Sequence, residues 1–160
     1  IIRIASLYGR YKKNFLKVFI NILISDKKIN VVSDQLISLT YSYDIASFIM
    51  SIIEDYTNTD INNKFYNGCN IIHAANKGYT NWYDVAKIIA YELNYAFKDM
   101  DQLEVKKIKS NQWVSKALRP KDSRLVLSND LNFNSLYQMP HWEDSLKHAC
   151  KLYIGDMKSE

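Results

Sequence analysis

The stretch Asn70 to Leu93, NIIHAANKGYTNWYDVAKIIAYEL, decides the fold class. Its apolar run Ile71–Ala75 is suited to a buried strand, and the polar segment Asn76–Trp82 ends that run. Asn81 is a good N-cap, Asp84 three residues later can reach back toward it as in a capping box, and apolar residues then recur at helical spacing. The pattern predicts a strand, a loop and a helix. Because ligands of open α/β sheets bind at the carboxyl ends of strands, the loop is a candidate ligand site.

The same criteria predict alternating strands and helices along the rest of the chain, which is typical of an α/β architecture with mainly parallel strands. His73 falls inside an apolar strand, so it is expected to be a buried core histidine rather than a ligand. Strands are expected at Ile1–Ala5, Ile29–Val32, Val105–Ile108 and Arg124–Leu127, and helices are expected to begin near Asn14, Ser42, Ser128 and Pro140.

Composition sets the broad class of the protein. A chain of 160 residues with 48% apolar residues has the size and the material for one globular domain. The net charge of +4 comes from lysines scattered among acidic residues, which indicates a solvated surface and no nucleic-acid partner. No apolar run approaches the ~20 residues that a membrane-spanning helix needs, so no membrane partner is expected. Cys69 and Cys150 have no zinc-type spacing and are expected to be reduced core thiols of a cytoplasmic protein.

Common catalytic and cofactor motifs do not occur in this sequence. It has no GxGxxG, no GxxxxGK[ST] and no GxSxG, and its three histidines have no partner at metal-ligand spacing. The chain begins at Ile1 within an expected strand, which would lack a preceding partner. We therefore expect residues 1–160 to be the carboxyl-terminal part of a longer protein.

Five segments, taken in order, resemble motifs of the dTDP-4-dehydrorhamnose reductases. In that family they read IRTSWLYG with a following NF pair, VVDDQxGSPTYxxDLA, H-A-(A/G)-x-G-x-x-S-W-Y-E-F-A, A-x-R-P-x-x-S and P-x-W-x-x-A-L. No single piece is specific, but the order and spacing agree over nearly the whole chain. The matching segments are Ile2–Gly9, Val31–Ala46, His73–Ala86, Lys116–Ser123 and Pro140–Leu146.

The resemblance implies the carboxyl-terminal, substrate-binding part of an extended short-chain dehydrogenase/reductase with a Rossmann-like fold. Such an enzyme holds NADPH in an amino-terminal domain and reduces dTDP-4-dehydro-L-rhamnose to dTDP-L-rhamnose. The family's glycine-rich loop and its catalytic Ser/Thr and YxxxK residues precede the strand at which this chain starts. No catalytic residue is therefore expected here, NADPH is expected to bind the missing amino-terminal domain, and a homodimer is kept as an open expectation.

The resemblance also implies which residues face the dTDP-sugar. Arg119 matches the arginine of the R-P motif and is expected to contact the diphosphate, because a planar guanidinium suits bidentate phosphate contacts. Ser123 lies nearby in the same motif. Residues expected around the sugar-nucleotide cleft with a lower rank are Arg3, Asn14, Gln35 and Thr40.

Some positions depart from the family pattern. Ser6 replaces the family's tryptophan, Ile4 its threonine, and Ile37–Thr40 its G-S-P-T loop, whose Gly and Pro constrain the backbone differently. One interpretation of these changes is that the substrate is a different deoxysugar nucleotide. The alternative function is a non-catalytic binding module, resembling the regulatory β subunit of methionine adenosyltransferase.

Overall fold

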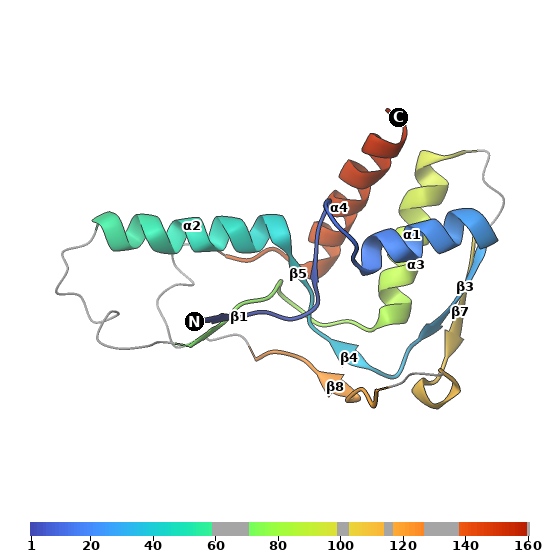
Figure 1. The fold of residues 1–160 in the computed structure, drawn as a ribbon, viewed down its shortest axis with the longest axis horizontal. Helices are drawn as coiled ribbons and strands as arrows, with labels where there is room; N and C mark the ends of the chain where they lie inside the picture. Colours follow the sequence, from blue (N-terminus) through green and yellow to red (C-terminus); the bar gives the residue numbers. More distant parts are fainter. Residues whose placement is uncertain (59–70, 99–102, 114–116, 127–137, 160) are drawn as a thin grey trace.

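The computed structural model describes residues 1–58, 71–98, 103–113, 117–126 and 138–159. It is an α/β structure with four helices among these residues (Figure 1). No helix in these ranges is long and apolar enough to span a membrane. The elements in order are β1 (Ile2–Arg3), β2 (Leu7–Tyr8), α1 (Phe15–Asp26), β3 (Lys28–Val32), β4 (Leu36–Ile37), β5 (Thr40–Tyr41), α2 (Ser42–Asn58), β6 (Ile72–His73), α3 (Trp82–Ala96), β7 (Glu104–Ile108), a 3₁₀ turn (Ser110–Gln112), β8 (Asp122–Ser123) and α4 (Trp142–Met157).

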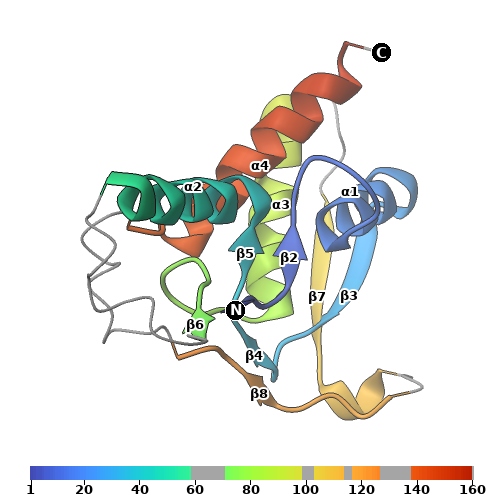
Figure 2. The same cartoon turned by 60° about the vertical axis from the view of Figure 1, so that its left-hand side comes forward.

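Every strand pair in the described residues is parallel, as the sequence predicts. The pairs are β1 with β6, β2 with β5, β3 with β7, and β4 with β8. The longest pair joins β3 and β7 over five residues each, from Lys28 opposite Glu104 to Val32 opposite Ile108. Each pair connects segments far apart in the sequence. In Figure 2 the β4–β8 pair lies below β5.

The main core lies where α1, α3 and α4 pack together with β3 (Figure 1). Buried side chains from all three helices fill it: Leu16 and Ile20 from α1, Ile89 from α3 and Leu146 from α4 have no exposed surface. Burying an aliphatic side chain of this size contributes about 1.5–3 kcal/mol. One apolar face of each of these helices is therefore buried in this core.

Two asparagines begin helices as predicted. The Asn14 side chain accepts a hydrogen bond from the Leu16 N–H at 3.0 Å, and the Asn81 side chain accepts one from the Asp84 N–H at 3.0 Å. The Asp84 carboxylate accepts from the Asn81 side-chain amide at 2.6 Å, so the two side chains bond to one another at the start of α3.

A second, smaller core lies between α2 and the β1–β6 pair. It contains Ile45 and Phe48 of α2, Ile72 of β6, and Met139. The outer part of α2 extends away from the other helices in Figure 1.

A buried polar network joins the two cores. Asp44, in the first turn of α2, accepts hydrogen bonds from the Asn76 side chain at 2.6 Å and the Ser145 hydroxyl at 2.5 Å. Asn76 in turn accepts one from the Tyr41 N–H at 2.8 Å. All three side chains of this Asp44–Asn76–Ser145 network are at most 5% exposed. Their mutual bonds satisfy polar groups that would otherwise be costly to bury.

Three expectations from the sequence require correction. The strand expected at Ile1–Ala5 is confined to Ile2–Arg3 (β1), and the backbone breaks at Ser6, whose positive φ of 44° extended backbone does not allow, before β2 begins at Leu7. Residues 124–126 are not a strand; the Arg124 N–H bends back to the Asp122 carboxylate at 3.1 Å, and β8 is Asp122–Ser123. His73 is only half-buried, with its Nδ1 3.1 Å from the Val126 carbonyl. Leu127, the helix expected from Ser128 and Cys69 lie outside the described residues.

We expect Asn76→Ala to lower the free energy of unfolding by about 3 kcal/mol, because it removes the partner of a buried carboxylate. Chemical denaturation monitored by circular dichroism measures this change. Asn81→Ala, which removes only a helix cap, should cost about 1 kcal/mol and is the control. Equal losses in the two variants would contradict a special role for the network.

The buried Cys150 thiol should be inert in the folded protein, because burial raises its pKa to about 12 and leaves almost no thiolate. In a Cys69→Ser background, we expect its reaction with Ellman's reagent at mildly alkaline pH to be slow until denaturant is added. Rapid labelling under native conditions would refute this.

Candidate functional site

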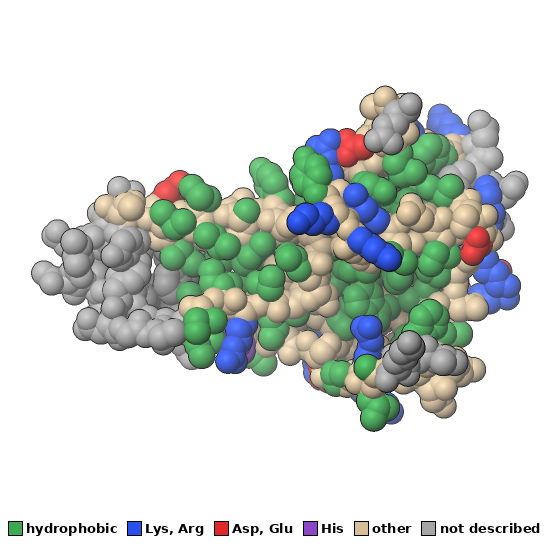
Figure 3. Space-filling view, viewed as in Figure 1, with side chains coloured by type: hydrophobic (Ala, Val, Ile, Leu, Met, Phe, Trp, Pro, Cys, Tyr) green, Lys and Arg blue, Asp and Glu red, His purple; other side chains and the backbone are tan. Residues whose placement is uncertain are grey.

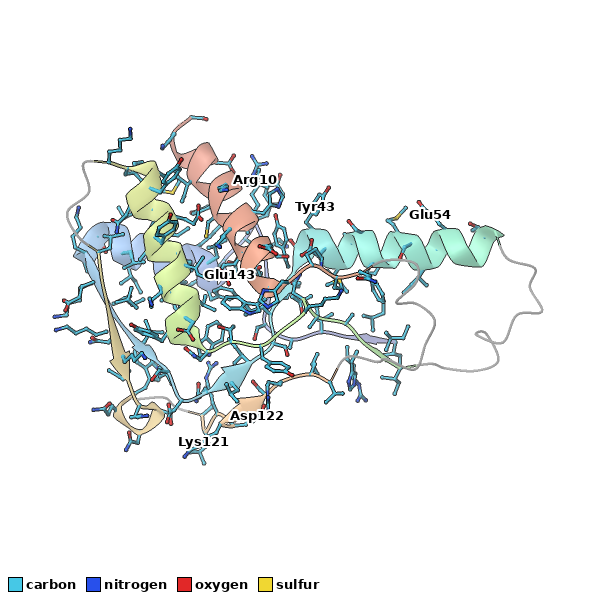
Figure 4. All side chains as sticks on the ribbon, turned by 180° about the vertical axis from the view of Figure 1, so that it is seen from behind. Arg10, Tyr43, Glu54, Lys121, Asp122 and Glu143 are labelled. Atoms are coloured by element: carbon cyan, nitrogen blue, oxygen red, sulfur yellow. The ribbon has the colours of Figure 1, made fainter. Side chains whose placement is uncertain are left out.

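A cavity lies between the loop that follows β6 and the segment that contains β8. Its volume of about 740 Å³ falls inside the ~300–1,000 Å³ typical of small-molecule sites. Figure 4 shows the β8 edge from behind, where Lys121 and Asp122 lie together. The lining residues are Asn76, Lys77, Gly78, Tyr79, Asp122, Arg124, Leu125 and Val126.

The first wall, Asn76–Tyr79, is held on the protein by its backbone. The Lys77 N–H donates to the Pro140 carbonyl at 2.9 Å, and the Lys77 carbonyl accepts from the Trp142 N–H at 3.0 Å. Gly78 has φ +82°, and a Cβ there would lie 2.5 Å from the His141 ring, so the position requires glycine. The wall therefore has a fixed shape, set by its contacts with the start of α4.

The second wall carries an arginine paired with a carboxylate. The Arg124 guanidinium donates to the Asp122 carboxylate, from Nε at 2.9 Å and from Nη2 at 2.6 Å. It also lies over the Tyr79 ring, 4.8 Å from the ring centroid, in a cation–π arrangement. Hydrogen bonds from the Arg124 side chain and backbone hold the pKa of Asp122 below its usual range. The Arg124 guanidinium is thus held between the Asp122 carboxylate and the Tyr79 ring of the first wall.

Three of the residues expected to face substrate belong to β8 or precede β4 or β8 in the chain, and none of them lines the cavity. Ser123 sits between two lining residues, and its hydroxyl donates to the Leu36 carbonyl at 3.2 Å. Gln35 is 8% exposed and directly precedes β4, the partner of β8. Arg119 is exposed, three residues before β8. These assignments remain predictions.

The other three expected residues do not line the cavity either. The Thr40 hydroxyl donates to the Ala5 carbonyl at 2.7 Å, which ties β5 to the segment before β2. The Asn14 amide group donates to the Gly9 carbonyl at 2.8 Å while its oxygen caps α1. Arg3 is exposed on β1, opposite His73. Thr40 and Asn14 therefore have structural bonds in this fold.

The sequence indicated the Asn76–Trp82 loop as a candidate ligand site, but it did not single out Arg124 or Tyr79. The position of the loop after an apolar strand was the available signal, and four of its residues line the cavity. Nothing local marks Arg124, because its partner Tyr79 is distant in sequence. No cluster of three or more metal-ligating side chains occurs in the part of the chain that is described.

Several solved structures with this fold are enzymes that act on nucleotide sugars. A dTDP-4-dehydrorhamnose reductase from Bacillus anthracis, in complex with NADP, is 30% identical with a TM-score of 0.74, covering 93% of this chain and 47% of that one. A second, from Clostridium acetobutylicum, is 27% identical with a TM-score of 0.72, covering 95% of this chain and 48% of that one. A UDP-galactose 4-epimerase, 13% identical with a TM-score of 0.65, covers 98% of this chain and 45% of its own and shares the fold. The class is the extended short-chain dehydrogenase/reductase.

Sequence comparison gives the family. The RmlD substrate binding domain matches residues 1–154, and the chain belongs to this family. A dTDP-4-dehydrorhamnose reductase of Sinorhizobium fredii is 28% identical over 155 residues, covering 92% of this chain and 47% of that protein. A dTDP-4-keto-6-deoxy-D-glucose reductase of Streptomyces niveus is 25% identical over 157 residues, covering 98% of this chain and 48% of that protein. The chain spans about half the length of these curated relatives.

We expect Arg124→Gln to raise the pKa of Asp122 toward its ordinary value, because the hydrogen bonds that favour the carboxylate are lost. A pH titration of the Asp122 carboxyl carbon by NMR measures this. In the wild type, the Asp122–Arg124 pair stabilises the fold fully at pH values above the unfolded-state pKa of Asp. This stabilisation is lost as the pH falls through the lowered pKa that Asp122 has in the folded protein. Glu143, whose pKa is lowered by Lys147, should titrate identically in both proteins. An unchanged Asp122 titration would contradict the assignment.

Proposed function

We propose that this chain is the substrate-binding half of an NADPH-dependent reductase that converts dTDP-4-dehydro-L-rhamnose to dTDP-L-rhamnose. The match of the RmlD substrate binding domain over residues 1–154 carries this proposal. The cavity between the β6 loop and β8 supports it with a site of suitable size and one ordered cation.

The cofactor belongs to another part of the enzyme under this proposal. The sequence has four glycines and no GxGxxG loop, so its residues do not fit a dinucleotide pyrophosphate site. The solved B. anthracis relative, in complex with NADP, is about twice as long as the region it shares with this chain. We therefore assign NADPH, and the proton donor of the reaction, to an amino-terminal half outside residues 1–160.

An apolar surface supports a docking role for that half. On α2, Ile49, Met50 and Ile53 are 38–52% exposed, and Ile4 and Ile71 beside β1 and β6 are 39% and 46% exposed. Figure 3 shows hydrophobic side chains gathered over α2 and the region below it. Contiguous apolar surface of this kind is typical of an interaction site.

Within this chain, the proposed task is to bind and orient the dTDP-sugar. Arg119 would contact the diphosphate, with Ser123 and Gln35 beside it and Arg3, Asn14 and Thr40 at lower rank. A cytoplasmic location and a homodimeric assembly are parts of the same proposal.

We expect the chain to bind dTDP, and Arg119→Ala to weaken binding roughly tenfold through loss of a charge-assisted hydrogen bond. Isothermal titration calorimetry measures the affinity. Lys151→Ala, which removes an exposed cation of α4, is the matched control. When the chain is combined with the cofactor-binding half of a relative, dTDP-4-dehydrorhamnose should drive NADPH oxidation. A folded chain that does not bind dTDP would contradict the proposal; dTDP binding without reductase activity would favour the non-catalytic alternative.

A further inference from the structure

Arg124 is the most ordered cation at the cavity. Its guanidinium is fixed in two directions, because Asp122 engages its Nε and Nη2 edge while the Tyr79 ring lies against its face. An arginine held in this way has already lost the side-chain freedom that binding would otherwise cost.

Donors of Arg124 remain available after these contacts. A guanidinium has five N–H groups, and Asp122 takes those of Nε and one of Nη2. No described residue accepts a hydrogen bond from Nη1. The Arg124 side chain is 36% exposed and lines the cavity, so a ligand there can reach the guanidinium.

The charge balance of the lining favours an anion. Lys77 and Arg124 are its cations, and Asp122 is the single carboxylate among the eight lining residues. The Lys77 Nζ donates to the neutral Gln138 side chain at 2.7 Å, so its charge is not compensated by that contact. Leu125 and Val126 add apolar surface, the combination that small-molecule sites commonly present.

We propose that Arg124, stacked on Tyr79 and oriented by Asp122, is an anion anchor of this cavity and contacts the diphosphate of the nucleotide sugar. This inference rests on the proposed function and adds to it a residue beyond the motif that ends at Ser123. Arg119, the arginine that the family resemblance indicates, is exposed outside the lining, whereas Arg124 lines the cavity with its orientation set.

The test compares three ligands, dTDP, thymidine and inorganic pyrophosphate, by calorimetric titration of the full chain. Arg124→Gln approximately keeps the side-chain length and removes the charge. It should weaken the binding of dTDP and of pyrophosphate roughly tenfold and leave the binding of thymidine unchanged. Arg124→Lys keeps the charge without the planar fork, so its affinities for dTDP and pyrophosphate should lie between those of the wild type and of Arg124→Gln. In the wild type, pyrophosphate should also shift the ring resonances of Tyr79 in NMR spectra.

Lys121→Gln is the matched control. Lys121 is exposed in the same segment, carries the same charge as Arg124 and does not line the cavity. Its replacement should change each affinity by less than about twofold, as expected for a solvated surface charge. Circular dichroism and denaturation of each variant test whether the fold is retained. If Arg124→Gln is destabilised, the ligand affinities of Arg124→Lys provide the test.

The outcomes separate this inference from the proposed function. If the wild type binds dTDP and neither Arg124 variant weakens it more than Lys121→Gln does, the anchor is refuted and the substrate-binding role stands. If pyrophosphate binds through Arg124 and dTDP does not bind, the anion anchor stands and the nucleotide-sugar role is refuted. If the wild type binds neither ligand, both are refuted.

Discussion

The structure depends on a buried carboxylate that must be satisfied. Asp44 lies at the first turn of α2, where a helix favours negative charge, but burial makes an unpaired carboxylate costly. Asn76 and Ser145 bring donors to it from the β6 loop and from α4. Three segments far apart in sequence must therefore meet at one point, and their relative positions are fixed by hydrogen-bond geometry.

The same network shapes the cavity. Asn76 is both a member of the network and a lining residue, and the next residue, Lys77, pairs by its backbone with Pro140 and Trp142. Gly78 then fits against the His141 ring where a larger residue would not. One wall of the site is thus continuous with the buried structure, while the other wall is held by the pairing of β8 with β4.

The two cores have different surroundings. The main core is enclosed by α1, α3 and α4 on several sides, whereas the smaller core under α2 is bordered by exposed isoleucines and Met50. Enclosure of the main core follows from helices that pack on one another within residues 1–160. The smaller core has apolar surface left over, which agrees with a fold that spans about half the length of its curated relatives.

The sequence by itself determined the α/β class, the caps at Asn14 and Asn81 and the family, because the alternation of elements, the capping residues and the order of the motifs can be read along the chain. The break at Ser6 and the half-exposed position of His73 were missed, since each depends on contacts between distant segments. The pairing of Arg124 with Tyr79 was hidden for the same reason. Only the tertiary structure decided where the charged wall of the cavity lies, because pairing of β4 with β8 brings residues 122–126 alongside the loop after β6.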